Sequence, residues 1–195
     1  MMNLEKMKQK KRTTTKSRVK KSLLAATTFL CLTTPLLLLK RYLDMETIDF
    51  SVNELGKPYH KEIAGKQTVN FNISHSGEFI LEGFAVGMDI GVDVQEMAGC
   101  PDYREIAGNF YTAEEAEDVI NEGPELFFQY WAAKEAYVKA IGIGLGRGMD
   151  FFSVRNGEIT EKGRKGQGWH LYPVKIEGYA AYVAAHKKGD KSNEL

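Results

Sequence analysis

Cysteine is scarce in this chain of 195 residues, which contains only Cys31 and Cys100. Two cysteines that lie so far apart provide neither a disulfide framework nor a CxxC metal-binding motif. We therefore expect the protein to work in a reducing compartment, the cytoplasm. Histidine is scarce as well, and the spacing of His60, His170 and His186 matches no metal-binding pattern.

The sequence also has no net charge, because 26 basic residues balance 26 acidic ones. Its 43% hydrophobic and 27% charged residues exclude both a disordered acidic chain and a membrane-embedded bundle. The charges are nevertheless segregated, since residues 1–45 carry eleven basic residues and only two acidic ones. A basic arm on an acidic body indicates an anionic ligand near the N-terminus, and the alternative is a solvated tail.

An uncharged stretch, residues 22–39, follows the arm and is flanked by basic residues. Its length is at the short end of what a membrane span needs, and a basic region before an apolar run also resembles an export signal. Four threonines dilute the stretch, Pro35 interrupts it, and no small-residue cleavage site follows. A core helix and a targeting or membrane segment are both open for residues 16–41, because the apolar positions form no clean helical stripe.

Periodicity predicts several strands in the rest of the chain. They are expected at residues 47–52, 69–73, 79–86, 90–94, 151–154, 169–176 and 179–185. The strands at 79–86 and 90–94 are separated by three residues, which predicts a β-hairpin. The polar residues 74–77 are expected to form a turn at the end of the strand 69–73.

Two helices are indicated by their terminal residues. Thr112 and Glu115 form a capping box, which predicts a short helix through about residue 120. Pro124 precedes a longer helical pattern that Gly142 ends. The fold class is therefore α+β, with a mostly antiparallel sheet packed on two or three helices.

Candidate chemical groups lie on one predicted strand and one predicted helix. The two-residue period of a strand places Asp93 and Gln95 on the same face. The helical period stacks Glu135 and Lys139, which in an arbitrary helix would form a surface ion pair. An unpaired carboxylate inside an apolar strand is costly, so a cation would compensate Asp93. Asp93 and Glu135 can supply oxygen ligands for Mg²⁺ at a phosphate-transfer site, which Lys139 would also face.

Three motifs occur together, and each is short. They are Asn-Ile-Ser-His-Ser-Gly at 72–77, Gly-Val-Asp at 91–93, and Trp-Ala-Ala-Lys-Glu-Ala-Tyr-Val-Lys-Ala-Ile-Gly at 131–142. In this order and at these separations they resemble the 4′-phosphopantetheinyl transferases, in particular the longer, pseudo-dimeric branch that activates surfactin-synthetase-type carrier proteins. The resemblance extends from about residue 56 to the C-terminal strand. Three co-ordered motifs are far more specific than one.

This resemblance implies a 4′-phosphopantetheinyl transferase-like fold made of two similar α/β halves, residues 1–90 and 91–195, in a monomeric protein. It implies that the phosphopantetheine arm of coenzyme A is transferred to a serine of an apo acyl or peptidyl carrier protein, which releases adenosine 3′,5′-bisphosphate. By similarity, Asp93 and Glu135 bind Mg²⁺, and Glu135 is also the candidate general base. The remaining residues implied are Lys139 at the leaving phosphate, Ser74 with His75 at the phosphates, and Lys57 at the nucleotide end.

Two departures from the family pattern stand out. Gln95 replaces a second strand carboxylate, so it would ligate the metal only as a neutral amide, directly or through water. This substitution motivates an alternative function, a coenzyme A and carrier-protein binding homologue with weak or no activity. At the N-terminus the family's first strand has no counterpart, whereas Leu23 and Leu24 resemble the start of a core helix behind bases that meet coenzyme A. We therefore rank a core helix above a membrane span, and coenzyme A above nucleic acid as the ligand.

Overall fold

The computed structural model describes residues 37, 40, 50–52, 58–60, 69–144, 148–166 and 168–187. The chain divides into two compact units, residues 1–48 and 49–195, and nearly all of the described residues belong to the second. The basic arm, Lys57 and all of the segment 16–41 except Leu37 and Lys40 lie outside the described residues. Within the described part, no helix is long and apolar enough to cross a membrane.

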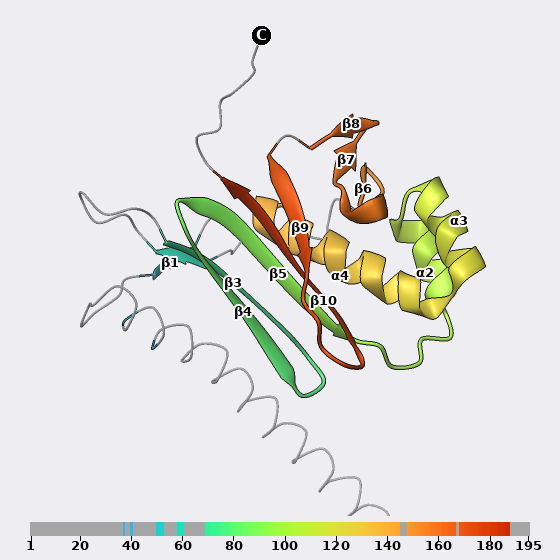
Figure 1. The fold of residues 1–195 in the computed structure, drawn as a ribbon, viewed down its shortest axis with the longest axis horizontal. Coiled ribbons are helices and arrows are strands. Elements are labelled where there is room, and N and C mark those ends of the chain that lie inside the picture. The colour runs from blue at the N-terminus through green and yellow to red at the C-terminus, as the bar shows by residue number, and fades with distance from the viewer. Residues whose placement is uncertain are drawn as a thin grey trace, which may run out of the picture. The chain divides into compact units, whose positions relative to one another are not determined.

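The fold is α+β, as the sequence predicts, and every pair of strands in the described sheets is antiparallel (Figure 1). The strands are β1 Phe50–Val52, β2 Pro58–His60, β3 Val69–Ser76, β4 Phe79–Val86, β5 Met88–Glu96, β6 Phe152–Ser153, β7 Thr160–Glu161, β8 Arg164–Lys165, β9 Trp169–Pro173 and β10 Tyr179–Lys187. The helices are α2 Tyr103–Phe110, α3 Ala113–Glu122 and α4 Pro124–Ile141, with a 3₁₀ turn at Arg155–Gly157.

The predicted helix ends are confirmed. The Thr112 hydroxyl accepts a hydrogen bond from the Glu115 amide, and the Glu115 carboxylate accepts one from the Thr112 amide, so both halves of the capping box are present. Helix α4 has Pro124 in its first turn and ends at Gly142, whose φ of 73° is the left-handed conformation that favours glycine.

The predicted pairing of strands 79–86 and 90–94 is wrong. Strand β4 pairs with β3 over eight positions, whereas β5 pairs with β10 over nine. Consequently β3 continues through Ser74 and His75, and the turn lies at Gly77, whose φ is 54°. Strand β4 passes over one face of β5, where the absent side chain of Gly83 leaves room for the side chains of β5.

The C-terminal strands also differ in extent from the prediction. Strand β9 ends at Pro173, and β10 continues to Lys187. The sequence did not indicate β7 and β8, a hairpin of two-residue strands that turns at Lys162 and Gly163, both at positive φ. Strands this short provide no measurable periodicity, so they could not be found from the alternation of residues.

Helix α4 covers the sheet formed by β5, β10 and β9 (Figure 1). Its closest approach is at Gly91 of β5, where an added Cβ atom would collide with the carbonyl oxygen of Ala136 and the amide nitrogen of Ala140. Ala136 and Ala140 are buried and have the smallest side chains of that helix face. The glycine and the two alanines therefore let the strand lie directly against the helix backbone, two residues from Asp93.

We expect Gly91→Ala to lower the free energy of unfolding by about 1–3 kcal/mol, because the added methyl group must push β5 away from α4. Urea denaturation followed by circular dichroism measures the change. Gly108→Ala is the matched control, since Gly108 lies in α2 with no atom near the position of its Cβ, and alanine favours helix there. Equal stability of the Gly91→Ala and wild-type proteins would contradict the close approach.

Strands β3 and β5 belong to separate sheets, yet side chains join them. The Asn70 amide donates to the carbonyl oxygen of Met88 (2.6 Å), and Asn72 Oδ1 accepts from the amide of Val92 (2.8 Å). At the far end the Ser76 hydroxyl accepts from the amide of Glu96 (2.8 Å). We call this row of contacts, together with Ser74, the β3–β5 seam. The seam places the polar side chains of β3 along β5, with Ser74 beside Asp93.

A buried ion pair ties α3 and the chain after α4 to α4 itself. Lys134 and Glu115 are fully buried, and their charged atoms are 2.7 Å apart. Lys134 Nζ also donates to the carbonyl oxygens of Met149 and Phe152, at 2.8 and 2.5 Å. Glu115 accepts from the Val154 amide at 2.6 Å. These bonds use all three donor hydrogens of Lys134 and join α4 to α3 and to residues 149–154.

Candidate active site

A compact polar cluster forms where β3, β5 and α4 meet. Asp93 Oδ1 accepts hydrogen bonds from the Ser74 hydroxyl (2.7 Å) and from Lys139 Nζ (2.6 Å). Lys139 Nζ is also 3.1 Å from the Ser74 oxygen, so the three groups contact one another. Three residues that are far apart in the sequence are thereby brought together.

The second carboxylate oxygen of Asp93 is unpaired among the described residues. Asp93 is 5% exposed, and its Oδ2 is buried with no hydrogen-bond partner among the described residues. A buried carboxylate oxygen without a partner is costly, and a cation is its natural complement. Lys139 only partly meets this need, because it contacts Oδ1, and its own side chain is 28% exposed.

Glu135 lies one helical turn before Lys139 and is 7% exposed. Burial raises the pKa of this carboxyl; the positive charge of Lys139 opposes the shift, and the negative charge of Asp93 adds to it. The ion pair that Lys139 makes is with Asp93 on β5, so the ordinary interpretation of Glu135 and Lys139 as a surface pair on one helix is wrong. A carboxylate with a raised pKa, buried beside a second carboxylate, is typical of functional sites.

The other predicted site residues are less closely grouped. His75 is exposed, and the alternation of β3 directs it to the face opposite Ser74. Gln95 is half-buried on β5, two residues beyond Asp93 on the same face. Lys57 lies outside the described residues. The structure therefore assembles Ser74, Asp93, Glu135 and Lys139, and it leaves His75 apart from them.

A pocket of about 380 Å³ adjoins Gln95. Its wall is largely apolar and comes from the end of β5, α2 and the first half of α4. The lining residues are Ser76, Gln95, Glu96, Ala98, Gly99, Cys100, Ile106, Phe127, Phe128 and Trp131. Phe127 and Phe128 are buried, and with Trp131 they form part of the wall of this pocket. A largely apolar pocket with a few polar groups in its lining is a typical binding site for an organic substrate.

Comparison with known proteins identifies the family. A family model described as the 4′-phosphopantetheinyl transferase superfamily matches residues 89–185, which include most of β5, the helices α2, α3 and α4, and most of β10. This chain belongs to the 4′-phosphopantetheinyl transferase superfamily. The match includes Asp93, Glu135 and Lys139, three of the four clustered residues.

Individual phosphopantetheinyl transferases support this membership. A 4′-phosphopantetheinyl transferase of Bacillus subtilis is 37% identical over 117 residues, which cover 58% of this chain and 50% of that protein. The 4′-phosphopantetheinyl transferase Sfp of Bacillus subtilis strain 168 is 35% identical over 117 residues, with the same coverage. A fungal one from Paxillus involutus is 30% identical over 164 residues, covering 72% of this chain and 62% of the relative. The chain thus spans about half the length of the bacterial relatives it matches.

Some residues that shape this candidate site could not be singled out from the sequence. Lys134 had no separate role in the sequence pattern, although its buried pair with Glu115 joins α4 to α3. Asn70 and Asn72 were not singled out, although their side chains align β3 with β5. The alternation of Asn, Asn, Ser and Ser along β3 predicts one polar face of this strand, but it does not predict which element that face contacts.

Proposed function

We propose that this protein transfers the 4′-phosphopantetheine arm of coenzyme A to a serine of an apo acyl or peptidyl carrier protein. The observation that carries this proposal is the buried cluster in which Asp93, with an oxygen lacking any partner, meets Ser74 and Lys139 and lies near Glu135. Family membership supports it, because the relatives are named as phosphopantetheinyl transferases.

The donor set suits Mg²⁺. No group of three or more His, Cys, Asp or Glu side chains is arranged for a metal in the described part of the chain. Mg²⁺ at phosphate-transfer sites needs only one or two carboxylates, however, because water and substrate phosphates complete its shell. Asp93, through Oδ2, and Glu135 would hold the ion, and Gln95 lies where it can contribute directly or through water. When bound, the ion would offset negative charge on the phosphoryl oxygens.

The chain's own residues then have distinct tasks. The serine oxygen of the carrier protein forms a bond to the phosphorus next to the pantetheine arm, and the bond from that phosphorus to the bridging oxygen breaks. Glu135 accepts the serine proton, for which its raised pKa is suitable. Lys139 stabilises the negative charge on the leaving adenosine 3′,5′-bisphosphate. Ser74 has one hydroxyl proton, which it donates to Asp93 in this structure and which it would donate instead to a phosphate oxygen of coenzyme A once Asp93 holds the ion.

Intact-mass spectrometry of the carrier protein tests the proposal. Apo acyl and peptidyl carrier proteins are incubated with the full chain, coenzyme A and Mg²⁺, and we expect one phosphopantetheine to be added per carrier. A carrier with its acceptor serine changed to alanine should stay unmodified, and excess EDTA should stop the reaction. If no carrier in the panel gains mass, the transferase proposal fails.

The replacement of a carboxylate by Gln95 favours one alternative, a homologue that binds coenzyme A and carrier proteins without transfer. Isothermal titration calorimetry distinguishes it from the enzyme. Binding of coenzyme A without any increase in carrier mass would support the binder, whereas binding together with the mass increase would support the enzyme.

We expect Gln95→Glu to lower the Mg²⁺ concentration needed for half-maximal activity several-fold and to leave the maximal rate equal or higher. The added carboxylate would face the same side of β5 as Asp93 and would provide a charged ligand in place of an amide. The measurement is the initial rate of carrier modification against Mg²⁺ concentration. Glu122→Gln is the control, because Glu122 is exposed at the end of α3, outside the pocket beside Gln95, and its loss should not alter the Mg²⁺ dependence. An unchanged Mg²⁺ requirement in Gln95→Glu would remove Gln95 from the metal site.

A further inference from the structure

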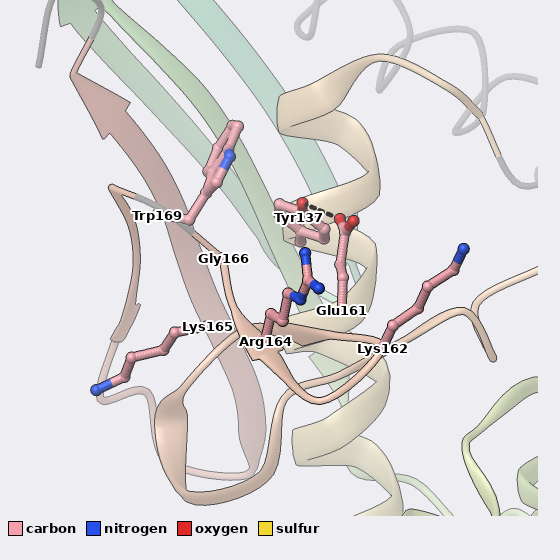
Figure 2. Close-up of a pocket in the computed structure, with 7 residues that line it drawn as sticks. All are labelled: Tyr137, Glu161, Lys162, Arg164, Lys165, Gly166 and Trp169. Atoms are coloured by element: carbon pink, nitrogen blue, oxygen red, sulfur yellow. Dashed lines mark hydrogen bonds between the residues drawn. The ribbon is translucent and has the colours of Figure 1, made fainter. Parts of the chain in front are cut away.

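A second pocket, of about 760 Å³, lies on another side of α4 (Figure 2). It is lined by Tyr137, Glu161, Lys162, Arg164, Lys165, Gly166 and Trp169. Tyr137 follows Glu135 by two residues, which places their side chains about 200° apart around the helix. The pocket is therefore separate from the Asp93 cluster, and the proposed transfer reaction makes no use of it.

Its aromatic wall is held in place. The Trp169 ring stacks on the His186 imidazole, with centroids 5.0 Å apart and planes 28° apart. The Tyr137 ring meets Trp169 nearly at right angles, also at 5.0 Å. The indole is half-buried and lines the pocket. A ring fixed by two neighbours can stack on a planar ligand without losing much conformational entropy.

The charged residues that line this pocket differ in whether they form ion pairs or hydrogen bonds with other described residues. Lys165 forms an ion pair with Glu158 at 2.6 Å, and Glu161 accepts a hydrogen bond from the Tyr137 hydroxyl at 2.7 Å. Arg164 and Lys162 take part in none of the ion pairs found among the described residues. Figure 2 shows the Arg164 guanidinium pointing toward Tyr137 and Glu161, whereas Lys162 extends outward at the rim. An anionic group can thus be met by one cation within the pocket and one at its edge.

We propose that this pocket binds a nucleotide. The base packs against Trp169, and the phosphate is held by Arg164 and Lys162. Glu161 is acceptor-only when ionised, and Tyr137 uses one of its oxygens, so the other favours a base that carries an amino group, such as adenine. The volume lies within the range of known small-molecule sites.

Other ligand classes fit the lining less well. Inorganic phosphate would use Arg164 and Lys162 but would leave the indole wall and the Glu161 acceptor unused. A neutral aromatic compound would stack on Trp169 but would leave both cations unmatched. Only a ligand with a flat ring, a donor on that ring and a negative group uses all of the features described. This inference does not depend on the transfer reaction.

Tryptophan fluorescence isolates the site, because the chain has only two tryptophans, Trp131 and Trp169. In the full chain carrying Trp131→Phe, we expect adenosine monophosphate to quench Trp169 with saturation. Adenosine and inorganic phosphate should each bind about tenfold more weakly, since each lacks one set of contacts. Inosine monophosphate, which has no amino group on its base, should also bind more weakly. Trp169 is not part of the Asp93 cluster, so a nucleotide bound at the proposed coenzyme A site should leave this signal unchanged.

Variants of Trp131→Phe complete the test. Arg164→Ala should weaken adenosine monophosphate about tenfold, because a hydrogen bond to a charged group is lost. Lys175→Ala removes an exposed lysine outside the pocket and should leave the affinity unchanged. Thermal melts establish that each variant is folded. Absence of saturable quenching, equal affinity for phosphate alone, or equal effects of Arg164→Ala and Lys175→Ala would each overturn the proposal.

Discussion

Asp93→Asn is expected to lower the rate of carrier-protein modification by at least about 10²–10³-fold, and Asp93→Ala to abolish it. The asparagine keeps the shape of the side chain, so the effect arises from charge. Its amide group cannot replace both carboxylate oxygens, of which one contacts Ser74 and Lys139 and the other has no partner in the part of the chain that the structure describes. Both the proposed metal ligand and the counter-charge of Lys139 are lost. The rate is measured by the intact mass of the carrier over time.

Asp102→Asn provides the control for this change. It is the same chemical substitution at an exposed position at the start of α2, outside both pockets. We expect it to retain the wild-type rate, and we expect both variants to unfold cooperatively in a thermal melt. A folded Asp93→Asn or Asp93→Ala protein with near wild-type activity would refute the assignment of Asp93 as a metal ligand.

Lys134→Met is expected to lower the free energy of unfolding by about 3–5 kcal/mol, because it leaves the carboxylate of Glu115 buried without its cation. The double variant Lys134→Met with Glu115→Leu should be more stable than Lys134→Met alone, since no uncompensated charge remains in it. It should not regain full stability, because the Val154 amide and the Met149 carbonyl also lose their partners. Urea denaturation of the four proteins in this double-mutant cycle measures the coupling.

The matched comparison is the exposed ion pair of Lys165 and Glu158, which has a similar distance of 2.6 Å. Lys165→Met should cost less than about 1 kcal/mol, because solvent screens an exposed pair. If Lys134→Met costs no more than Lys165→Met, the buried pair does not stabilise the packing of α4 against α3.

Local signals predicted the helices of this protein better than its strand pairing. The capping box at Thr112, the proline at 124 and the glycine at 142 act within a few residues, and each predicted helix end is close to the observed one. The partner of β5 was missed because it is β10, more than eighty residues later in the chain. Proximity in sequence favoured β4, and nothing in the alternation of residues distinguishes a neighbouring strand from a distant one.

In the candidate site, too, local patterns predicted the residues but not the contacts between distant elements. Asp93, Glu135 and Lys139 were selected by residue type and spacing, but the actual ion pair runs from Lys139 to Asp93, between two elements. Periodicity places residues on faces and does not give the distance between elements. That distance depends on Gly91, because Ala136 and Ala140 of α4 lie where its side chain would be. The sequence alone does not show which helix residues lie against this glycine.

The β3–β5 seam constrains the alignment of the two sheets. Because Asn70, Asn72, Ser74 and Ser76 alternate along β3, a slip of one residue would turn all four away from β5 and bring apolar side chains such as Phe71 into their place. A slip of β3 by two residues would place Ser74 beside the Val92 amide, which Asn72 now contacts. The serine hydroxyl is too short to replace the contact that the asparagine side chain makes there. Ser74 therefore meets Asp93 in a single register, and errors of strand alignment during folding should yield molecules in which the carboxylate lacks its serine.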